Sequence, residues 1–364
     1  IQERHGLNPY THTSSLDMAS CHRLGWYGQE RYWLTPPLND DPDRNSAFLE
    51  KQLRTGTEYV DVMQNCTLIY DGRNRLYIDK DDVTNSDHST MNAFLLAPRA
   101  EQRDKATHLP GISILLAARN SHNFYHWHHD CLPALGLVQS AGIPLAEIDH
   151  ILVDERNRGF QLQTLTAAGI RPEQIRFIDV ENSHLTCDQM LMARVQNQQG
   201  MAQSRRHLDW LRRTFLPCTD TRPEQQRQQS PSRLAIKRDV RGFTDPESSY
   251  RILEDKGYTC VQLENFSYIE QVSMFANATD IVAPHGAGLS LLSFAKHGTV
   301  VHEFYGDHVQ PCFWSISSAL GLKYHNYNCS GITDKAVTSS NKNLSERLAM
   351  SVRVSPELLK SIPD

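Results

Sequence analysis

The residues His285 to Gly288, read as His-Gly-Ala-Gly, have the types and spacing of an anion-binding turn. They follow an apolar strand-like run and precede a short helical run, a glycine stop at Gly298 and a second strand ending at Phe304. The backbone N–H groups of Gly286, Ala287 and Gly288 would lie at the start of that helix, where they and the helix dipole favour a phosphate or pyrophosphate. His285 could donate a further hydrogen bond. The alternative is a tight turn whose glycines serve only close packing.

Charged side chains stand near this turn in the expected sheet. Arg238 and Arg241 follow an apolar strand pattern, where an arginine can neutralise the charge on a leaving diphosphate. The alternative is a surface salt bridge to Asp239 or Asp245. Glu303 ends the strand after the turn, where a carboxylate can accept hydrogen bonds from ribose hydroxyls or remain simply solvated.

A second group of candidate residues lies between Asn123 and Asp130. His126 and Asp130 are four residues apart and share one helix face, with Asn123 one turn earlier. Either Asp130, or His126 oriented by Asp130, can take a proton from an attacking hydroxyl. Helix capping and compensation of the helix dipole are the alternative for Asp130 and Asn123. Trp127 is either a core residue or an aromatic wall against a sugar.

The same segment supports a rival hypothesis. His122 and His126 have the i, i+4 spacing of two metal ligands on a helix, which is typical of a metal-dependent hydrolase. Histidine is frequent in this chain, with 17 in all, so a third ligand is easily found by chance. We therefore predict no metal site.

The elements that must position these residues follow an α/β rhythm in two runs, which predicts parallel, doubly wound sheets with ligands outside the carboxyl ends of the strands. Ser267 and Glu270 form a capping box at one helix start. The predicted strands are 58–70, 75–78, 112–117, 148–153, 174–180, 185–195, 233–237, 258–263, 280–284, a strand that ends at 304, and 323–327. The predicted helices are 126–140, 160–168, 246–255, 267–276 and 312–320.

The domain organisation follows from this rhythm. We predict an irregular N-terminal extension with a β-hairpin (1–110), a first Rossmann-like domain (111–218), a polar linker (219–232) and a second Rossmann-like domain (233–344). A C-terminal helix (345–364) is expected to return to the N-terminal domain. Two such domains facing a cleft form the GT-B architecture, here suggested by analogy of topology.

Composition excludes several function classes. The 364 residues are 39 % hydrophobic with a net charge of −5, and Lys plus Arg (37) are fewer than Asp plus Glu (42), so no nucleic-acid footprint is expected. No apolar run is long enough to cross a membrane, although the start at Ile1 indicates trimming that could have removed a signal or anchor. Eight scattered cysteines and four sequons (Asn65, Asn277, Asn328, Asn343) leave the compartment open: cytoplasmic in a bacterium, Golgi or ER lumen for a trimmed secretory-pathway enzyme.

Two motifs resemble the signatures of family 61 glycosyltransferases. Residues 123–133, Asn-Phe-Tyr-His-Trp-His-His-Asp-Cys-Leu-Pro, resemble the family's Asn-Tyr-Tyr-His-Trp, Asp, Leu-Pro signature, and residues 284–289, with Glu303, resemble its second signature. The resemblance runs from about Ile112 to Tyr327. The sequence departs from the family at Lys237, where Ser is common, and at Ala134, which replaces an Arg on the acceptor side.

The resemblance implies an inverting, metal-independent transferase with a GT-B fold. Such an enzyme moves a sugar, commonly xylose or N-acetylglucosamine, from a UDP-sugar to a glycan or glycoprotein acceptor, and requires no cofactor. It implies donor binding by His285, Gly286, Ala287, Gly288, Arg238, Arg241 and Glu303, acceptor binding by Asn123 and Trp127, and catalysis by Asp130 and His126. A sugar-nucleotide or glycan-binding module without catalysis stays a further alternative, and the oligomeric state stays open.

Overall fold

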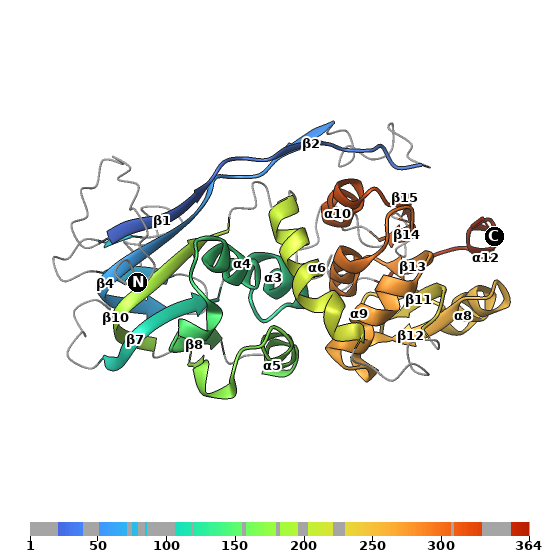
Figure 1. Cartoon of the computed structure of the whole chain (residues 1–364). Coiled ribbons are helices and arrows are strands. Elements are labelled where there is room, and N and C mark those ends of the chain that lie inside the picture. The colour runs from blue at the N-terminus through green and yellow to red at the C-terminus, as the bar shows by residue number, and fades with distance from the viewer. Residues whose placement is uncertain are drawn as a thin grey trace, which may run out of the picture. The chain divides into compact units, whose positions relative to one another are not determined.

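The computed structural model of the chain describes residues 21–38, 51–70, 75–78, 84–85, 106–117, 120–154, 158–179, 183–195, 203–220, 230–306, 309–329 and 351–363 (Figure 1). Contacts divide the chain into two compact units. The first contains the described residues within 1–30 and 55–197, and the second contains those within 31–54 and 198–364. The predicted domain boundaries stay predictions, and most of the predicted linker lies outside the described residues.

The first unit is built on a mixed eight-stranded sheet in the order β6-β5-β4-β10-β7-β8-β9, with β1 paired to β4. Its strands are β1 (Cys21–Tyr27), β4 (Glu58–Tyr70), β5 (Arg75–Ile78), β6 (Thr84–Asn85), β7 (Thr107–Leu116), β8 (His150–Asp154), β9 (Ile175–Ile178) and β10 (Ser183–Arg194). β10, β7, β8 and β9 run parallel, whereas β4 is antiparallel to β10 and to β5. The predicted hairpin is therefore part of this sheet, although its turn, residues 71–74, lies outside the described residues.

The helices of the first unit are α3 (Phe124–His126), the π-helix η3 (Trp127–Cys131), α4 (Pro133–Ser140), the 3₁₀ helices η4 (Leu145–Glu147) and η5 (Pro172–Gln174), and α5 (Arg158–Ala167). The single helix predicted over 126–140 is thus wrong in detail. Asn123 caps α3, and Pro133, which has no N–H to donate, starts a new helix at the first turn of α4. The π turn between them joins the two α-helical pieces.

The second unit contains a parallel five-stranded sheet in the order β12-β11-β13-β14-β15. Its strands are β11 (Arg233–Lys237), β12 (Thr259–Gln262), β13 (Asp280–Pro284), β14 (Val300–Tyr305) and β15 (Lys323–Asn328), and its helices are α6 (Arg205–Asp220), α8 (Pro246–Asp255), α9 (Tyr268–Asn277) and α10 (Cys312–Leu320), with the short η7 (Leu263–Asn265), η8 (Ala287–Phe294) and α12 (Pro356–Lys360). The predicted parallel α/β sheet is confirmed here, and so is the capping box of Ser267 and Glu270 at α9.

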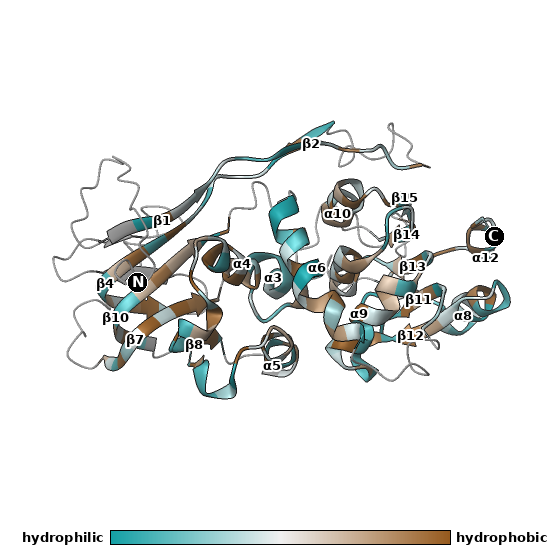
Figure 2. Cartoon of the chain, viewed as in Figure 1, coloured by the Kyte–Doolittle hydropathy of each residue, from teal (hydrophilic) through white to brown (hydrophobic). Residues whose placement is uncertain are grey.

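Burial of apolar strands holds each sheet in place. All five residues of β8 are buried, as are the last four of β13, which is the pattern of strands covered on both faces. Figure 2 shows β7 and β8 largely in the hydrophobic colour. In the first unit α4 packs over β10 and β4. In the second, α6 and η8 pack with α9 (Figure 1).

Two parts of the second unit were not predicted from the sequence, and a third, the C-terminal helix, packs elsewhere than expected. α6 buries His207, Leu208, Trp210, Leu211 and Phe215. The strands β2 (Arg31–Trp33) and β3 (Gln52–Arg54) form an antiparallel ribbon. α12 was expected on the N-terminal domain, but packs against α8 in the core of the second unit, where its Leu359 is buried. Within the described ranges no helix has both the length and the apolar character needed to cross a bilayer.

Candidate functional site

The order of strands in the second unit creates a switch point between β11 and β13. From β11 the chain first crosses to β12 on one side and then returns to β13 on the other. In open parallel sheets ligands bind outside the carboxyl ends of strands at such a point. Arg238 directly follows β11 and His285 directly follows β13, so both predicted residues stand at this edge.

Arg238 is joined to the turn after β13. Its Nη1 donates a hydrogen bond to the carbonyl oxygen of His285. A Cβ on Gly286 would overlap the guanidinium of Arg238, while the φ of Gly286 is 171°, an extended value that any residue adopts. Glycine at position 286 is therefore required by the approach of Arg238 and not by backbone conformation.

The arginines at this edge form no ion pair with the carboxylates that the structure describes. Among the described residues neither Arg238 nor Arg241 has a carboxylate within ion-pair distance, and the two predicted alternatives are used elsewhere: Asp239 accepts from Gln262 and Asp245 caps α8. Burial, together with the neighbouring charge of Arg241, lowers the pKa of Arg238 to about 10. The negative charge of Glu264 opposes this shift without cancelling it, so an anion bound at this edge would stabilise the charged guanidinium.

Arg241 has an unusual backbone conformation. Its φ is +60°, in the left-handed region that non-glycine residues rarely occupy. Burial lowers its pKa as well. Backbone strain of this kind persists where surrounding contacts fix a loop, and it is frequent at ligand-binding sites.

Backbone N–H groups of the turn after β13 add to the candidate anion site. Within the part of the chain that the structure describes, no acceptor takes a hydrogen bond from the N–H groups of Gly286, Ala287 or Gly288, whereas Leu289 N already donates to Gly286 O. They open the eight-residue 3₁₀ helix η8, whose first N–H groups have no partner within the helix. The arrangement is what the sequence predicts for a turn that binds a phosphate.

A buried hydrogen-bond network orients the ring of His285. Its Nδ1 lies 2.6 Å from Glu303 Oε1, and the other carboxylate oxygen of Glu303 accepts a 2.6 Å hydrogen bond from the hydroxyl of Tyr324. The Tyr305 hydroxyl lies 2.8 Å from that of Tyr324, and the Tyr305 ring stacks on His285 at 5.0 Å. Burial raises the pKa of both tyrosines, which stay neutral donors. Because Nδ1 faces the carboxylate, Glu303 fixes the orientation of the ring, and a contact from the ring to a phosphate would be made through Nε2.

This network changes the expected role of Glu303. The side chain is fully buried and both of its oxygens have partners, so it is not presented to a ribose as the sequence analysis expected. It instead sets the orientation of His285. Tyr324, 21 positions further along the chain, was missed because nothing in the local sequence connects it with Glu303.

His126 and Asp130, the residues predicted for acid–base chemistry in the first unit, are in contact with each other. His126 Nδ1 lies 2.6 Å from Asp130 Oδ2, and the two side chains are 35 % and 28 % exposed, so both are open to solvent. An ionised carboxylate only accepts hydrogen bonds, so Nδ1 carries the proton and Nε2 is the acceptor nitrogen. The pair thus has the base–orienter arrangement of a histidine activated by aspartate.

Two predicted acceptor contacts are not supported. Trp127 is fully buried, and its Nε1 donates to Thr164 Oγ1 at 2.8 Å, so it is a core residue and not an aromatic wall. The side chain of Asn123 accepts from Tyr125 N at 2.9 Å and caps α3. Capping, which was the alternative for Asn123, is therefore its observed role.

A buried carboxylate near this pair was missed. Asp154 ends β8 with no exposed surface and accepts hydrogen bonds from Tyr70 (3.1 Å) and Ser121 (3.2 Å). Ser121 lies two residues before the cap of α3, so Asp154 helps to hold the segment that leads to His126. The signal in the sequence was a charged residue at the end of an otherwise apolar strand.

The arrangement of possible metal-binding side chains gives the metal-dependent hydrolase hypothesis no support. Over the described ranges, no three side chains of His, Cys, Asp or Glu are grouped so that they could hold a metal ion. His126 is hydrogen-bonded to Asp130, and His128, its neighbour but one, is buried so that its pKa falls to about 3.

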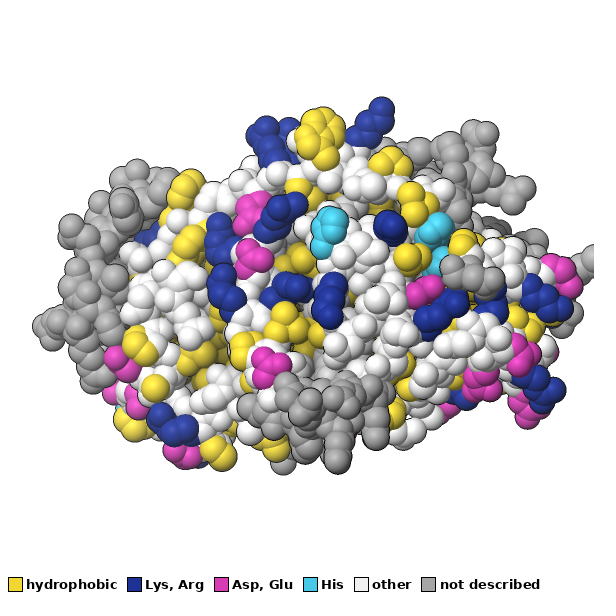
Figure 3. Space-filling view, turned by 45° about the vertical axis from the view of Figure 1, so that its right-hand side comes forward, with side chains coloured by type: hydrophobic (Ala, Val, Ile, Leu, Met, Phe, Trp, Pro, Cys, Tyr) yellow, Lys and Arg dark blue, Asp and Glu magenta, His cyan; other side chains and the backbone are white. Residues whose placement is uncertain are grey.

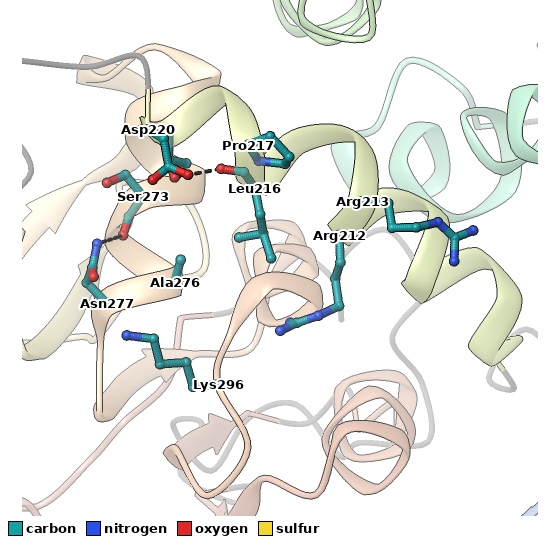
Figure 4. A pocket seen from close by; sticks show the side chains of 10 residues that line it. Arg212, Arg213, Leu216, Pro217, Asp220, Ser273, Ala276, Asn277 and Lys296 are labelled. Atoms are coloured by element: carbon teal, nitrogen blue, oxygen red, sulfur yellow. Dashed lines mark hydrogen bonds between the residues drawn. The ribbon is translucent and has the colours of Figure 1, made fainter.

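The second unit also has a hollow of about 760 Å³ away from these residues (Figure 4). Arg212, Leu216 and Lys296 border it, and Arg212 Nη1 donates to Ser293 O and Ala295 O, both at 2.9 Å. Asn277, on its rim, ends α9 three residues before β13 begins. The hollow is thus at the amino ends of the strands, the opposite edge from Arg238 and His285.

Comparison with known families identifies one match. Residues 124–302 match the model of the family described as Glycosyltransferase 61. The matched segment starts at α3 and ends within β14, so it contains the His126–Asp130 pair, Arg238 and the turn after β13. No curated protein matches the chain.

Proposed function

The chain is a family 61 glycosyltransferase, and on that premise we propose that it transfers a sugar from a UDP-sugar to a hydroxyl of a glycan or glycoprotein, with inversion and without a required metal. Xylose and N-acetylglucosamine are the favoured sugars. The observation that carries the proposal is Arg238, a half-buried guanidinium without a carboxylate partner among the described residues, bonded to the glycine turn at the switch point. The proposal includes the GT-B layout, with the donor on the second unit and the base on the first.

The donor diphosphate is proposed to bind at the carboxyl edge of β11 and β13. The N–H groups of Gly286, Ala287 and Gly288 and the guanidinium of Arg238 bind its oxygens, and Nε2 of His285 donates when the ring is protonated against Glu303. Charge on the diphosphate grows as the glycosidic bond breaks. Preorganised donors at that position stabilise the transition state more than the bound substrate.

The acceptor hydroxyl is proposed to lose its proton to Nε2 of His126. The hydroxyl oxygen then forms a bond to the anomeric carbon on the face opposite the diphosphate, and the bond from that carbon to the phosphate oxygen breaks. UDP departs with the electron pair, and the configuration of the sugar is inverted. Asp130 holds the ring through Nδ1 and stabilises the imidazolium that forms.

Stabilisation by nucleotides tests this proposal. UDP or a UDP-sugar at about 100 times its Kd, in EDTA, should stabilise the native state by about 2.7 kcal/mol, since it binds only the folded chain. Thermal unfolding with UDP, CMP and GDP sugars measures the effect. A rise in Tm with UDP compounds alone supports the proposal; a rise only with Zn²⁺, and none with any nucleotide, would contradict it.

Gly286→Ala tests why glycine stands at position 286. The new Cβ would occupy the space of the Arg238 guanidinium, so the arginine has to leave the turn. We expect UDP affinity to fall by about tenfold, the cost of losing one charge-assisted contact, with no further loss in the Gly286→Ala, Arg238→Ala double variant. Titration calorimetry with UDP measures this double-mutant cycle.

Gly28→Ala is a suitable control, because the nearest atoms to the new Cβ are 3.9 Å away. Gly298→Ala is unsuitable, because Gly298 has φ +83°. Additive losses in the double variant would show that Gly286 acts independently of Arg238.

A further inference from the structure

The β2–β3 ribbon of the second unit has one buried and one exposed face. Tyr32 is opposite Leu53 in the register and both are buried, whereas the neighbouring positions, Arg31 with Arg54 and Trp33 with Gln52, point the other way. Trp33 is 72 % exposed, the highest value for any large hydrophobic side chain among the described residues. The outer face therefore consists of two arginines, an indole and an amide.

The ribbon is held firmly from its inner side. The hydroxyl of Tyr32 lies 2.8 Å from Ser315 Oγ on α10, and Trp314 Nε1 donates to Thr35 O at 2.6 Å. Leu38 N donates to Tyr324 O at 2.8 Å. These bonds connect residues about 280 positions apart and fix the outer face as a platform.

Two features share that outer face. Arg31 and Arg54 are directly opposite each other, and like charges at opposed positions destabilise a strand pair. In the described portion of the chain neither has a carboxylate within ion-pair distance. The exposed indole of Trp33 beside them presents an aromatic surface to solvent, on which a ring can stack. Figure 3 shows Lys and Arg side chains together with hydrophobic ones along its upper edge, the height at which Figure 1 draws β2.

We propose that the outer face of the β2–β3 ribbon binds an acidic glycan, with Trp33 stacked on a sugar ring and Arg31 and Arg54 bound to its carboxylate or sulfate groups. A planar guanidinium matches either anion in a two-bonded geometry, and an anion between the two arginines removes their repulsion. Trp33 and Arg31 are separated by about 7 Å along the strand, so the ring and the acid come from adjacent parts of one chain. The inference rests on the proposed function, which supplies a glycan as acceptor, and names the acidic class of that acceptor.

Titration of the full chain with defined oligosaccharides tests the proposal. Tetragalacturonate supplies carboxylates, a heparin-derived tetrasaccharide supplies sulfates and maltotetraose is the neutral counterpart. We expect one or both acidic oligosaccharides to bind, and Trp33→Ala and the Arg31→Gln, Arg54→Gln double variant each to weaken that binding about tenfold or more. The acidic oligosaccharide that depends on the ribbon identifies the group as carboxylate or sulfate.

Matched controls keep this test specific. Trp26→Ala on β1 removes another exposed tryptophan, 53 % exposed, and Arg251→Gln on α8 removes another exposed arginine; neither should change the affinity. Equal affinity for maltotetraose, equal affinity for phosphatidylserine vesicles or single-stranded DNA, or unchanged binding by the ribbon variants would each overturn the proposal. UDP-dependent stabilisation measured in the same samples separates the cases: if UDP still stabilises the chain, the ribbon proposal alone has failed.

Discussion

Replacing Arg238 by alanine is expected to lower kcat/KM by about 10²–10³-fold, the usual cost of removing one preorganised donor to charge that develops in the transition state. The guanidinium is half-buried, bonds the carbonyl of His285 and has no carboxylate partner among the described residues. In the proposed donor site this charge acts on the leaving diphosphate. Because the diphosphate is also charged in the bound donor, UDP affinity should fall together with kcat.

Two further variants serve as controls for the Arg238→Ala prediction. Arg238→Lys keeps a positive charge but loses the planar fork, so it should recover only a small part of the activity. Arg251→Gln removes an exposed arginine of α8 in the same unit and should leave kcat/KM unchanged. Steady-state kinetics and UDP calorimetry measure both effects. Unchanged UDP affinity and activity in Arg238→Ala, with an unchanged Tm, would show that the diphosphate binds elsewhere.

The parallel sheet of the second unit was predictable because each part of it has a local signal. β11 and β13 are short apolar runs, α8 begins at Asp245 and Pro246, which cap and start a helix, and α9 begins with a capping box. The place of Arg238 and His285 then follows from the rule that ligands bind at the carboxyl ends of parallel strands. Candidate donor residues could thus be chosen from sequence alone.

Other parts of the site depend on contacts between distant residues. Gly286 reads as a flexible turn residue, yet its backbone is extended and the absence of a Cβ is needed by Arg238, 48 positions earlier. Glu303 reads as a strand-end carboxylate open to ligands, yet Tyr324 and His285 occupy both its oxygens. No pattern within a window of ten residues contains this information, because the partners lie 18, 21 and 48 positions apart.

α6 was missed for a different reason. It contains Pro217 and lies before a glutamine-rich stretch, and both features suggest a linker. The apolar spacing of Leu208, Leu211 and Phe215 was nevertheless helical, and these side chains are buried. Similarly, the break of the predicted 126–140 helix into α3, η3 and α4 was signalled by Pro133, which favours the first turn of a helix over its interior.

The relative loss of kcat in variants of His126 and Asp130 depends on which of the two is the base. In the structure Nδ1 of His126 already donates to Asp130. If Nε2 of His126 takes the proton, His126→Gln should lower kcat by about 10³-fold or more, in the upper part of the 10²–10⁴-fold range typical of general bases. Asp130→Asn should cost less than His126→Gln, since it disturbs only the orientation and tautomer of the ring and leaves Nε2 in place.

Rapid-quench kinetics at saturating UDP-sugar would measure the chemical step in His126→Gln and Asp130→Asn, and UDP calorimetry should show donor affinity unchanged in both. His122→Gln, one turn before His126 on an exposed position, is the matched histidine control and should keep its activity. It also tests the hydrolase hypothesis, in which His122 would be a ligand. A larger loss in Asp130→Asn than in His126→Gln would make Asp130 the base. Full activity in both variants would place the base outside this pair, because neither side chain would then touch the proton that the acceptor must lose.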